Sequence, residues 1–485
     1  MKIEERPMKK IIYSLLMVFV FLCVSSTPWA ADKYAMTFDQ INTDKAMLDD
    51  PSSYYEKVGR FEKVLPKELY DKLVFDTDEM SRLWAEAVGF KAPDVVGKLA
   101  PQIKPGKYTL ADKERLPFKE LMPAHYYNRF NEPGTGGLNH AGNFTEIEVV
   151  PTRQYYYATP IAKATIENAG KAKLDENGYL LYKSYLSGLP FPQPSGSHKA
   201  WQIVYNYKKN YHDFETTICF DQAQGIDSGF KRDFYTYGQY INVKSSSRLV
   251  MEPLGWFDKA AKRMDEDKLI YYRPLAPRDE YGNAYFTTGF NDPSKDPRFF
   301  VYLSFTRRIR KMSSSDRQDQ SVGSDQTFDD TDGFLQPLRP DEFPYSMKVI
   351  EEREFLVPAA TSSGSQWMDS KNKFVMKGLQ FERRPMWVVE MTQLDKNYIY
   401  SKRIGYFDKE TLDLWFMENY DQKERLYRTY STQWAFIPEM GVLTKFNDIM
   451  LDFIDLHSTF ETIRYFPTPW ITRNDISVKS MMKTK

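Results

Sequence analysis

The stretch PMWVVEMTQLDKNYIYSKRIGYFDKETLDLWFMENYDQKERLYRTYSTQWAFI, residues 385–437, decides the fold. It holds four extended runs rich in aromatic and β-branched residues, which fit half-buried pleated surfaces. The runs cover residues 386–393, 398–407, 412–420 and 425–436. Short polar segments separate them, LDKN, DKET and DQKE, and these are typical of hairpin connections. The stretch therefore predicts an antiparallel meander.

Both faces of this meander carry aromatic side chains. Strand alternation predicts one face with Tyr398, Tyr400, Ile404 and Tyr406, and the other with Ile399, Ser401, Arg403 and Phe407. We therefore expect both faces to be covered, one by a helix or loop layer and the other facing a cavity.

The rest of the chain divides into two parts. With 33 Tyr, 33 Phe and 9 Trp, aromatic residues make up 15% of the 485 residues, and strand patterns dominate from Phe144 onward. We predict an α+β, mainly β protein with a β domain over residues 151–475 and a mainly helical segment over residues 31–150. Helical spacing marks residues 52–65, 66–75 and 76–90, with Asp76 or Thr77 as the N-cap of the third helix. Residues 131–143, rich in glycine, predict a loop.

The first 30 residues have the plan of a secretory signal peptide. A basic segment ending in Lys9 and Lys10 leads into an apolar run over residues 11–24 that is too short to span a membrane comfortably. Cleavage is predicted near Ala30 or Ala31, so we expect an exported, periplasmic protein. Cys219 then remains as the single thiol and reads as a buried core residue.

The charge balance gives no indication of a nucleic-acid partner. The chain carries 66 basic and 66 acidic residues, so no global field favours a polyanion. The five histidines fall at no metal-ligand spacing, and the chain has neither a nucleophile elbow nor a P-loop. We predict no catalytic residues, no cofactor and no metal.

Residues 307–330, RRIRKMSSSDRQDQSVGSDQTFDD, are basic at the start and acidic at the end. Strand geometry places Arg308 and Arg310 on one face, where they could contact a ligand head group or form ion pairs with Asp325 and Asp329. The spacing of the aspartates fails the test for an EF-hand loop. Residues 327–332 are interpreted as a solvated loop with an Asp that caps a short helix or turn.

The proline-rich segment GLPFPQP, residues 188–194, is rigid because three prolines fix its backbone. It is interpreted either as the mouth of a ligand site, with Phe191 at the ligand, or as a stiff connection between a helix and a strand over residues 199–208.

Four blocks resemble a known family, in this order: SGLPFPQPSGSHKAWQIVYNY at 187–207, FFVYLSFTRRIRKMSSSDRQDQSVGSDQTFDD at 299–330, FPYSMKVIEEREFLVPA at 343–359, and the meander at 384–428. Together they are similar to the signature of the domain-of-unknown-function 1329 family of Gram-negative periplasmic proteins, which is described as outer-membrane lipoprotein-sorting-like. The chain departs from the family pattern in its first 120 or so residues and at Gln202, where an Asn is common.

The resemblance implies a fold like that of LolA and LolB, a large curved antiparallel sheet or unclosed β-barrel with helices across its open side. It also implies an apolar ligand in the hollow and a place in envelope lipid or lipoprotein traffic. Possible partners are an inner-membrane exporter of the resistance-nodulation-division type and an outer-membrane protein.

The residues and the resemblance together predict a carrier or chaperone that binds a lipid-like ligand without bond chemistry. The predicted lining is Tyr302, Phe305, Trp387, Tyr400, Tyr406, Trp415 and Phe191. Two alternatives remain open. A scaffold linking exporter and outer-membrane partner would need exposed apolar patches, and an envelope hydrolase would need a histidine paired with a carboxylate.

Overall fold

The computed structural model describes residues 61–135, 140–313, 315–321, 323–360 and 367–483. These residues belong to the compact unit formed by Asp44–Lys485. The predicted signal peptide and the predicted helix before Phe61 lie outside the described residues. In the described part of the chain, no helix is both long and apolar enough to cross a membrane.

Fifteen strands form one large sheet, which confirms the predicted α+β, mainly β class. In sheet order they are β1 (Gly106–Thr109), β2 (Glu146–Val149), β14 (Gln380–Gln393), β15 (Tyr400–Asp408), β16 (Leu414–Asp421), β17 (Leu426–Ile437), β18 (Val442–Asp452), β19 (His457–Pro467), β3 (Thr216–Ile226), β4 (Arg232–Lys244), β7 (Glu266–Ala276), β8 (Ala284–Phe290), β9 (Arg298–Leu303) and β10 (Arg308–Lys311). The fifteenth strand, β11 (Tyr345–Pro358), pairs with β14. Four short strands form two further ribbons: β5 (Ser246–Arg248) with β6 (Gly255–Trp256), and β12 (Trp367–Asp369) with β13 (Val375–Lys377).

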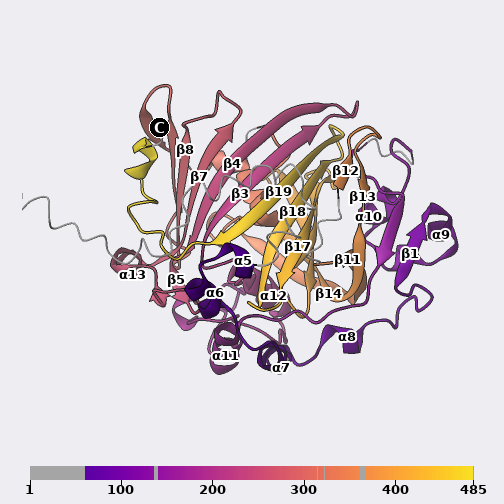
Figure 1. Ribbon diagram of the computed structural model, residues 1–485, viewed down its shortest axis with the longest axis horizontal. Helices are drawn as coiled ribbons and strands as arrows, with labels where there is room; N and C mark the ends of the chain where they lie inside the picture. Colours follow the sequence, from indigo (N-terminus) through magenta and orange to yellow (C-terminus); the bar gives the residue numbers. More distant parts are fainter. Residues whose placement is uncertain (1–60, 136–139, 314, 322, 361–366, 484–485) are drawn as a thin grey trace, which may run out of the picture. The chain divides into compact units, whose positions relative to one another are not determined.

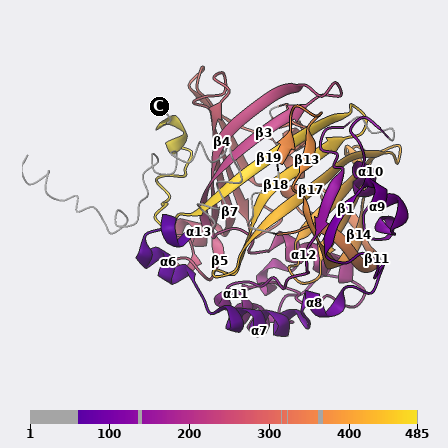
Figure 2. The same ribbon diagram turned by 45° about the vertical axis from the view of Figure 1, so that its right-hand side comes forward.

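The sheet curves but does not close on itself, because no pairing joins β10 to β1 among the described residues. Its pairs are antiparallel except for β2 beside β14. The C-terminal strands lie in its middle, between the strands that begin with β3 and the edge formed by β1 and β2 (Figures 1 and 2). The predicted meander is confirmed as β14 to β17, which pair in sequence order.

The predicted faces of residues 398–407 are wrong in one respect. A bulge shifts the register between Tyr400 and Lys402, and a bulge changes which residues share a face. Tyr400 and Arg403 therefore both contact Asp330 on one side of the sheet. Tyr406 contacts Glu418 on the opposite side.

Helices are short and surround the sheet. The α-helices are α5 (Phe61–Val64), α6 (Lys67–Leu73), α7 (Thr77–Val88), α8 (Ala92–Val95), α9 (Leu110–Arg115), α10 (Ala124–Arg129), α11 (Thr159–Asn168), α12 (Lys199–Lys208) and α13 (Lys259–Met264). The 3-10 helices are η2 (Phe118–Glu120), η3 (Tyr182–Ser184), η4 (Ser315–Gln318), η5 (Phe328–Gly333) and η6 (Ser480–Lys483). The predicted cap of α7 is confirmed, because the Asp76 side chain accepts a 2.7 Å hydrogen bond from the Glu79 amide.

The prediction of a strand over residues 199–208 is wrong, since this segment is helix α12. Its apolar residues Ala200, Ile203, Val204 and Tyr207 recur at the spacing of one helix face, and all four are buried. The aromatic and β-branched content of this segment favours a strand. The helical spacing outweighs that preference, because it places the apolar residues on one buried face.

The sheet has a filled half and an open half. In the filled half, formed by β14–β18, most residues on both faces are buried. On one face Tyr126 of α10 packs on Phe416 at a centroid distance of 4.8 Å, and on the other Tyr207 of α12 packs on Phe407 at 5.9 Å. The open half includes β4, β7 and β8. Strands β7 and β8 alternate between buried and half-buried residues, so one face of this half is less completely covered.

Candidate functional site

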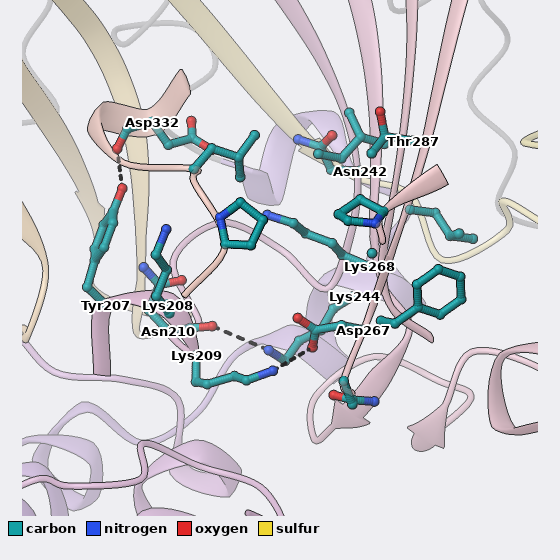
Figure 3. Close-up of a pocket in the computed structure, with 18 of the residues that line it drawn as sticks. Tyr207, Lys208, Lys209, Asn210, Asn242, Lys244, Asp267, Lys268, Thr287 and Asp332 are labelled. Atoms are coloured by element: carbon teal, nitrogen blue, oxygen red, sulfur yellow. Dashed lines mark hydrogen bonds and ion pairs between the residues drawn. The ribbon is translucent and has the colours of Figure 1, made fainter. Parts of the chain in front are cut away.

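A cavity of about 310 Å³ lies on the open half of the sheet (Figure 3). Two cross-strand rows form its floor, because residues opposite each other on adjacent strands share a face. The rows are Lys244, Lys268 and Gly289, and Asn242, Ile270 and Thr287, each running over β4, β7 and β8. The roof is the end of α12, the connection after it and the segment that follows η5.

The walls of the cavity are largely apolar and aromatic. They are formed by Leu180, Tyr182, Tyr205, Tyr211, Phe214, Phe290, Pro293, Pro297, Phe334, Leu335 and Leu338. Lys208 holds the roof in place, since its ammonium donates to the carbonyls of Phe334 and Gln336 and lies 4.0 Å from the centre of the Phe334 ring. Volume and lining are both typical of a small-molecule site.

The floor carries an unbalanced set of charges. Lys209 pairs with Asp267 at 3.2 Å, and Lys209, Lys244 and Lys268 together hold the pKa of that carboxyl below its usual value although burial acts to raise it. Among the residues that the structure describes, the Lys244 ammonium donates to the carbonyl of Asn210, at 3.4 Å, and lies over the Tyr211 ring, 4.1 Å from its centre. Asp267 therefore pairs directly with one of the three lysines, and Lys244 and Lys268 have no ion pair among the described residues.

Lys268 has no ion pair or hydrogen bond through its ammonium to any residue that the structure describes. Its side chain extends from β7 into the cavity, toward the side on which Lys208 lies (Figure 3). Burial lowers the pKa of Lys268 and lowers that of Lys244 to about 8, because removal from water disfavours the charged form. Gly289 makes room for Lys268, since a Cβ there would lie 3.2 Å from its Cγ.

The other carboxylates around the cavity are engaged elsewhere. Glu215 accepts hydrogen bonds from the amides of Leu249, Val250 and Met251. Asp332 pairs with Lys445 at 2.5 Å, and burial raises the pKa of Asp213 to about 7. None of them forms an ion pair with Lys244 or Lys268 among the described residues, although Asp332 and Glu215 favour the charged forms of Lys268 and Lys244, respectively, from a longer range.

The predicted lining residues lie outside this cavity. Trp387, Tyr400, Tyr406 and Trp415 are buried in β14, β15 and β16 of the filled half. Tyr302 is buried on β9, whereas Phe305, in the turn after it, is 88% exposed. Phe191 lines a separate hollow together with Pro190 and Pro192.

The interpretation of residues 327–332 as a solvated loop is wrong. They lie in and next to η5, where Thr327 and Asp330 form a reciprocal capping box, and Asp329 and Asp330 are fully buried. Each aspartate of the region has its own cation: Asp325 with His457, Asp329 with Arg317, Asp330 with Arg403 and Asp332 with Lys445. These partners fold the segment into the hollow of the sheet, because a buried carboxylate needs a counter-charge.

Arg308 and Arg310 take no part in this network. Both are exposed on β10, and neither has an ion pair among the described residues. The partners of Asp325 and Asp329 come instead from β19 and η4. In the part of the chain that the structure describes, no group of three or more His, Cys, Asp or Glu residues could hold a metal ion.

Three histidines are paired with carboxylates. His125 lies 2.8 Å from Glu418, His457 lies 2.6 Å from Asp325, and His212 lies 3.3 Å from Asp413. The second nitrogen of His457 faces Asp233 and that of His212 faces Asp213. The Nε2 atom of His125 is buried and has no partner among the described residues. Only His212 lines the cavity, so it is the histidine relevant to the hydrolase alternative.

Sequence reasoning missed the residues that form the cavity floor. One signal was available: Lys244 and Lys268 are cations inside segments that otherwise alternate as strands, INVK and EDKLIYY. A charge at a strand position that should be half-buried indicates either an ion pair or a ligand. The pairing of β4 with β7 sets the two lysines side by side. This is a tertiary contact, which the local sequence pattern does not predict.

Three solved structures are similar to parts of the chain. A domain from Vibrio parahaemolyticus described as an outer membrane lipoprotein-sorting protein domain is 14% identical over 59% of this chain and 100% of its own, with a TM-score of 0.42. A DUF1329 family protein from Desulfovibrio piger is 15% identical over 55% of this chain and 91% of its own, with a TM-score of 0.38. A LolA superfamily protein from Nitrosomonas europaea is 11% identical over 58% and 98%, with a TM-score of 0.36.

Among curated proteins, none matches the chain in sequence. The profile of the family described as Protein of unknown function (DUF1329) matches residues 132–475. This range contains all four signature blocks and more than half of the chain. The resemblance is thereby confirmed, and the protein belongs to the DUF1329 family.

Proposed function

We propose that the protein is a periplasmic carrier or chaperone that holds a lipid-like ligand in the cavity over β4, β7 and β8. The observation that carries the proposal is the contrast within one sheet. Most residues on both faces of the filled half are buried, whereas the open half keeps a cavity of about 310 Å³ with an apolar and aromatic lining.

The energy available from such a site suits reversible transport. Apolar burial contributes about 25 cal/mol per Å², so removing about 200 Å² of ligand surface from water would contribute about 5 kcal/mol before the costs of association. That supports binding that is strong enough to retain a ligand and weak enough to release it. Release then requires a partner that displaces the roof or offers a better site.

The predicted signal peptide and the family membership support a place in envelope lipid or lipoprotein traffic. An exporter in the inner membrane and a receiver in the outer membrane are the partners that such a carrier needs. Its cargo would move by burial and release, without a change in its bonds.

Mass spectrometry of lipids extracted from the natively purified protein tests the proposal. We expect a defined amphiphile in the unmodified protein and its loss in Thr287→Phe, which fills the cavity from the floor. Ser346→Phe, on an exposed position of β11, is the matched control and should keep the ligand. A lipid-free unmodified protein that also fails to bind added amphiphiles would contradict the carrier function.

The hydrolase alternative rests on His212, which lines the cavity and lies 3.3 Å from Asp413. The same experiment distinguishes it from the carrier. An added amphiphilic ester recovered at its original mass supports a carrier. Recovery of the cleaved acid, abolished by His212→Gln, would establish a hydrolase instead.

A further inference from the structure

The floor of the cavity pairs two like charges directly. Lys244 on β4 and Lys268 on β7 are opposite each other in the register of the sheet. Like charges at such positions destabilise a sheet. Asp267 is already paired with Lys209, and Asp332 and Glu215 act on Lys268 and Lys244 without forming an ion pair with either lysine among the described residues. The arrangement has an electrostatic cost in the free protein that packing alone does not explain.

The other cations of the cavity wall provide a contrast. Arg317 pairs with Asp329 at 2.7 Å. Lys295 donates to the carbonyl of Met264 and lies near the face of the Phe290 ring. Lys208 donates to two carbonyls of the roof. Lys268 stands apart, because its ammonium has no such acceptor among the described residues.

The geometry points to Lys268 and Lys244 as the binding site for the oxyanion head of an amphiphile, a carboxylate or a phosphate, whose apolar tail lies against the aromatic walls. An oxyanion between the two ammonium groups would supply the missing counter-charge and form charge-assisted hydrogen bonds with both. This inference rests on the proposed carrier function and names the class of its cargo.

The neighbouring residues support this orientation. Asn242 and Thr287, in the adjacent row of the floor, offer polar groups beside the lysines. Ile270 lies between them, and Phe290 and Phe334 stand at the walls. A head group would thus meet cations and hydrogen-bonding groups at the floor, while its chain would meet rings and aliphatic side chains.

Isothermal titration of the full chain with matched probes tests the inference. The probes are dodecanoate, dodecyl phosphate, 1-dodecanol and inorganic phosphate at pH 7. We expect dodecanoate and dodecyl phosphate to bind at least tenfold more tightly than 1-dodecanol. Lys268→Met should remove that preference and leave the affinity for 1-dodecanol unchanged. Lys244→Met should act in the same direction, and Lys348→Met, on an exposed position of β11 outside the cavity, is the control that should retain the preference.

Each other outcome has a distinct meaning. Equal affinity of the unmodified protein for dodecanoate and 1-dodecanol would overturn the head-group site and leave the carrier function standing. Failure of every dodecyl probe to bind would contradict the carrier function itself. Inorganic phosphate that binds as tightly as dodecyl phosphate would identify a site for free anions and overturn the amphiphile. An unchanged preference in both Lys268→Met and Lys244→Met would place the head group elsewhere.

Discussion

The filled and open halves of the sheet differ in whether their buried cations form ion pairs with carboxylates. In the filled half Arg384, Arg403 and Arg428 are buried, and each has a carboxylate partner: Asp408 and Glu410, Asp330, and Asp452. In the open half Lys244 and Lys268 lack such partners among the described residues. Complete pairing fixes structure, whereas incomplete pairing at the edge of a cavity leaves an interaction for a ligand to make.

Arginine at these three positions of the filled half fits this division, although Lys445 of β18 is also paired, with Asp332 and Asp448. Arginine keeps its charge and binds carboxylates with a planar fork, so it suits permanent buried pairs. Lysine loses its proton more readily when it is buried and unpaired, as the pKa of about 8 for Lys244 illustrates. Unpaired buried lysines suit a ligand that enters and leaves, because the folded protein does not require the ligand as a permanent partner.

The largest expected effect comes from breaking a pair in the filled half. Asp330→Ala leaves the buried guanidinium of Arg403 without its carboxylate, which typically costs about 3–5 kcal/mol. The free energy of unfolding from urea titration should fall by that amount. Lys348→Ala removes an exposed pair with Glu390 and should change it by less than about 1 kcal/mol. A fall for Asp330→Ala no larger than for this control would show that the pair does not fix the filled half.

His457 is an intermediate case, because it is paired but partly accessible. Its hydrogen bond to Asp325 raises its pKa to about 9. Its contribution is therefore complete below the unfolded pKa of about 6.5 and is lost as the pH rises through about 9. With a discount for the exposed partner Asp233, the loss between pH 6.5 and 9 should be about 1–2 kcal/mol. Urea titrations at the two pH values measure it.

The matched variant for this prediction is His457→Gln. It should be less stable than the unmodified protein at pH 6.5 and differ little from it at pH 9. A difference that is the same at both pH values would show that the charge of His457 contributes nothing.

In the open half, affinity for a carboxylate should follow the protonation of Lys244. The charged groups that act on it are Lys209, Lys268, Asp267 and Glu215. Because its pKa is about 8, the ammonium form falls to about a tenth at pH 9, and the affinity for dodecanoate should fall by up to about tenfold between pH 7 and 9. Titration calorimetry at both values measures this change. Lys244→Met should show a flatter profile, and an equal fall in that variant would assign the effect to another group.

The smallest expected effect is a gain in the stability of the protein. Lys268→Met removes the like-charge pair and should stabilise the ligand-free protein by about 0.2–1 kcal/mol. Thermal or urea unfolding of ligand-free samples measures it, with Lys295→Met as the control. A clear loss of stability in Lys268→Met would indicate that the lysine is a structural residue and would remove the contrast between the two halves.

The sequence predicts the elements of the filled half well and the cavity poorly, for physical reasons. Strands β14 to β17 are evident because short polar connections interrupt long apolar runs. The connection at 408–411 looks like an exposed turn, yet Asp408 and Glu410 are buried, because Trp84 and Tyr155 of distant segments bond to Glu410. Bulges are also invisible in the pattern, so the faces of Tyr400 and Tyr406 could not be separated.

The cavity likewise depends on contacts between segments that are distant in sequence. Its floor requires β4 to lie beside β7, and its roof requires the segment after η5 to fold back over α12. Four of the aromatic residues that were predicted to line the ligand site, Trp387, Tyr400, Tyr406 and Trp415, fill the core instead of lining this cavity, because a long curved sheet needs large side chains to close its filled half.

The pairing of β19 with β3 has a consequence for the order of folding. Residues 458–467 add to residues 217–226 in the middle of the sheet, so the sheet joins its two halves through strands that are more than 230 residues apart in sequence. Contacts of such long range form slowly. Because β19 lies between β18 and β3, a growing chain cannot unite the two halves of the sheet before β19 has been made.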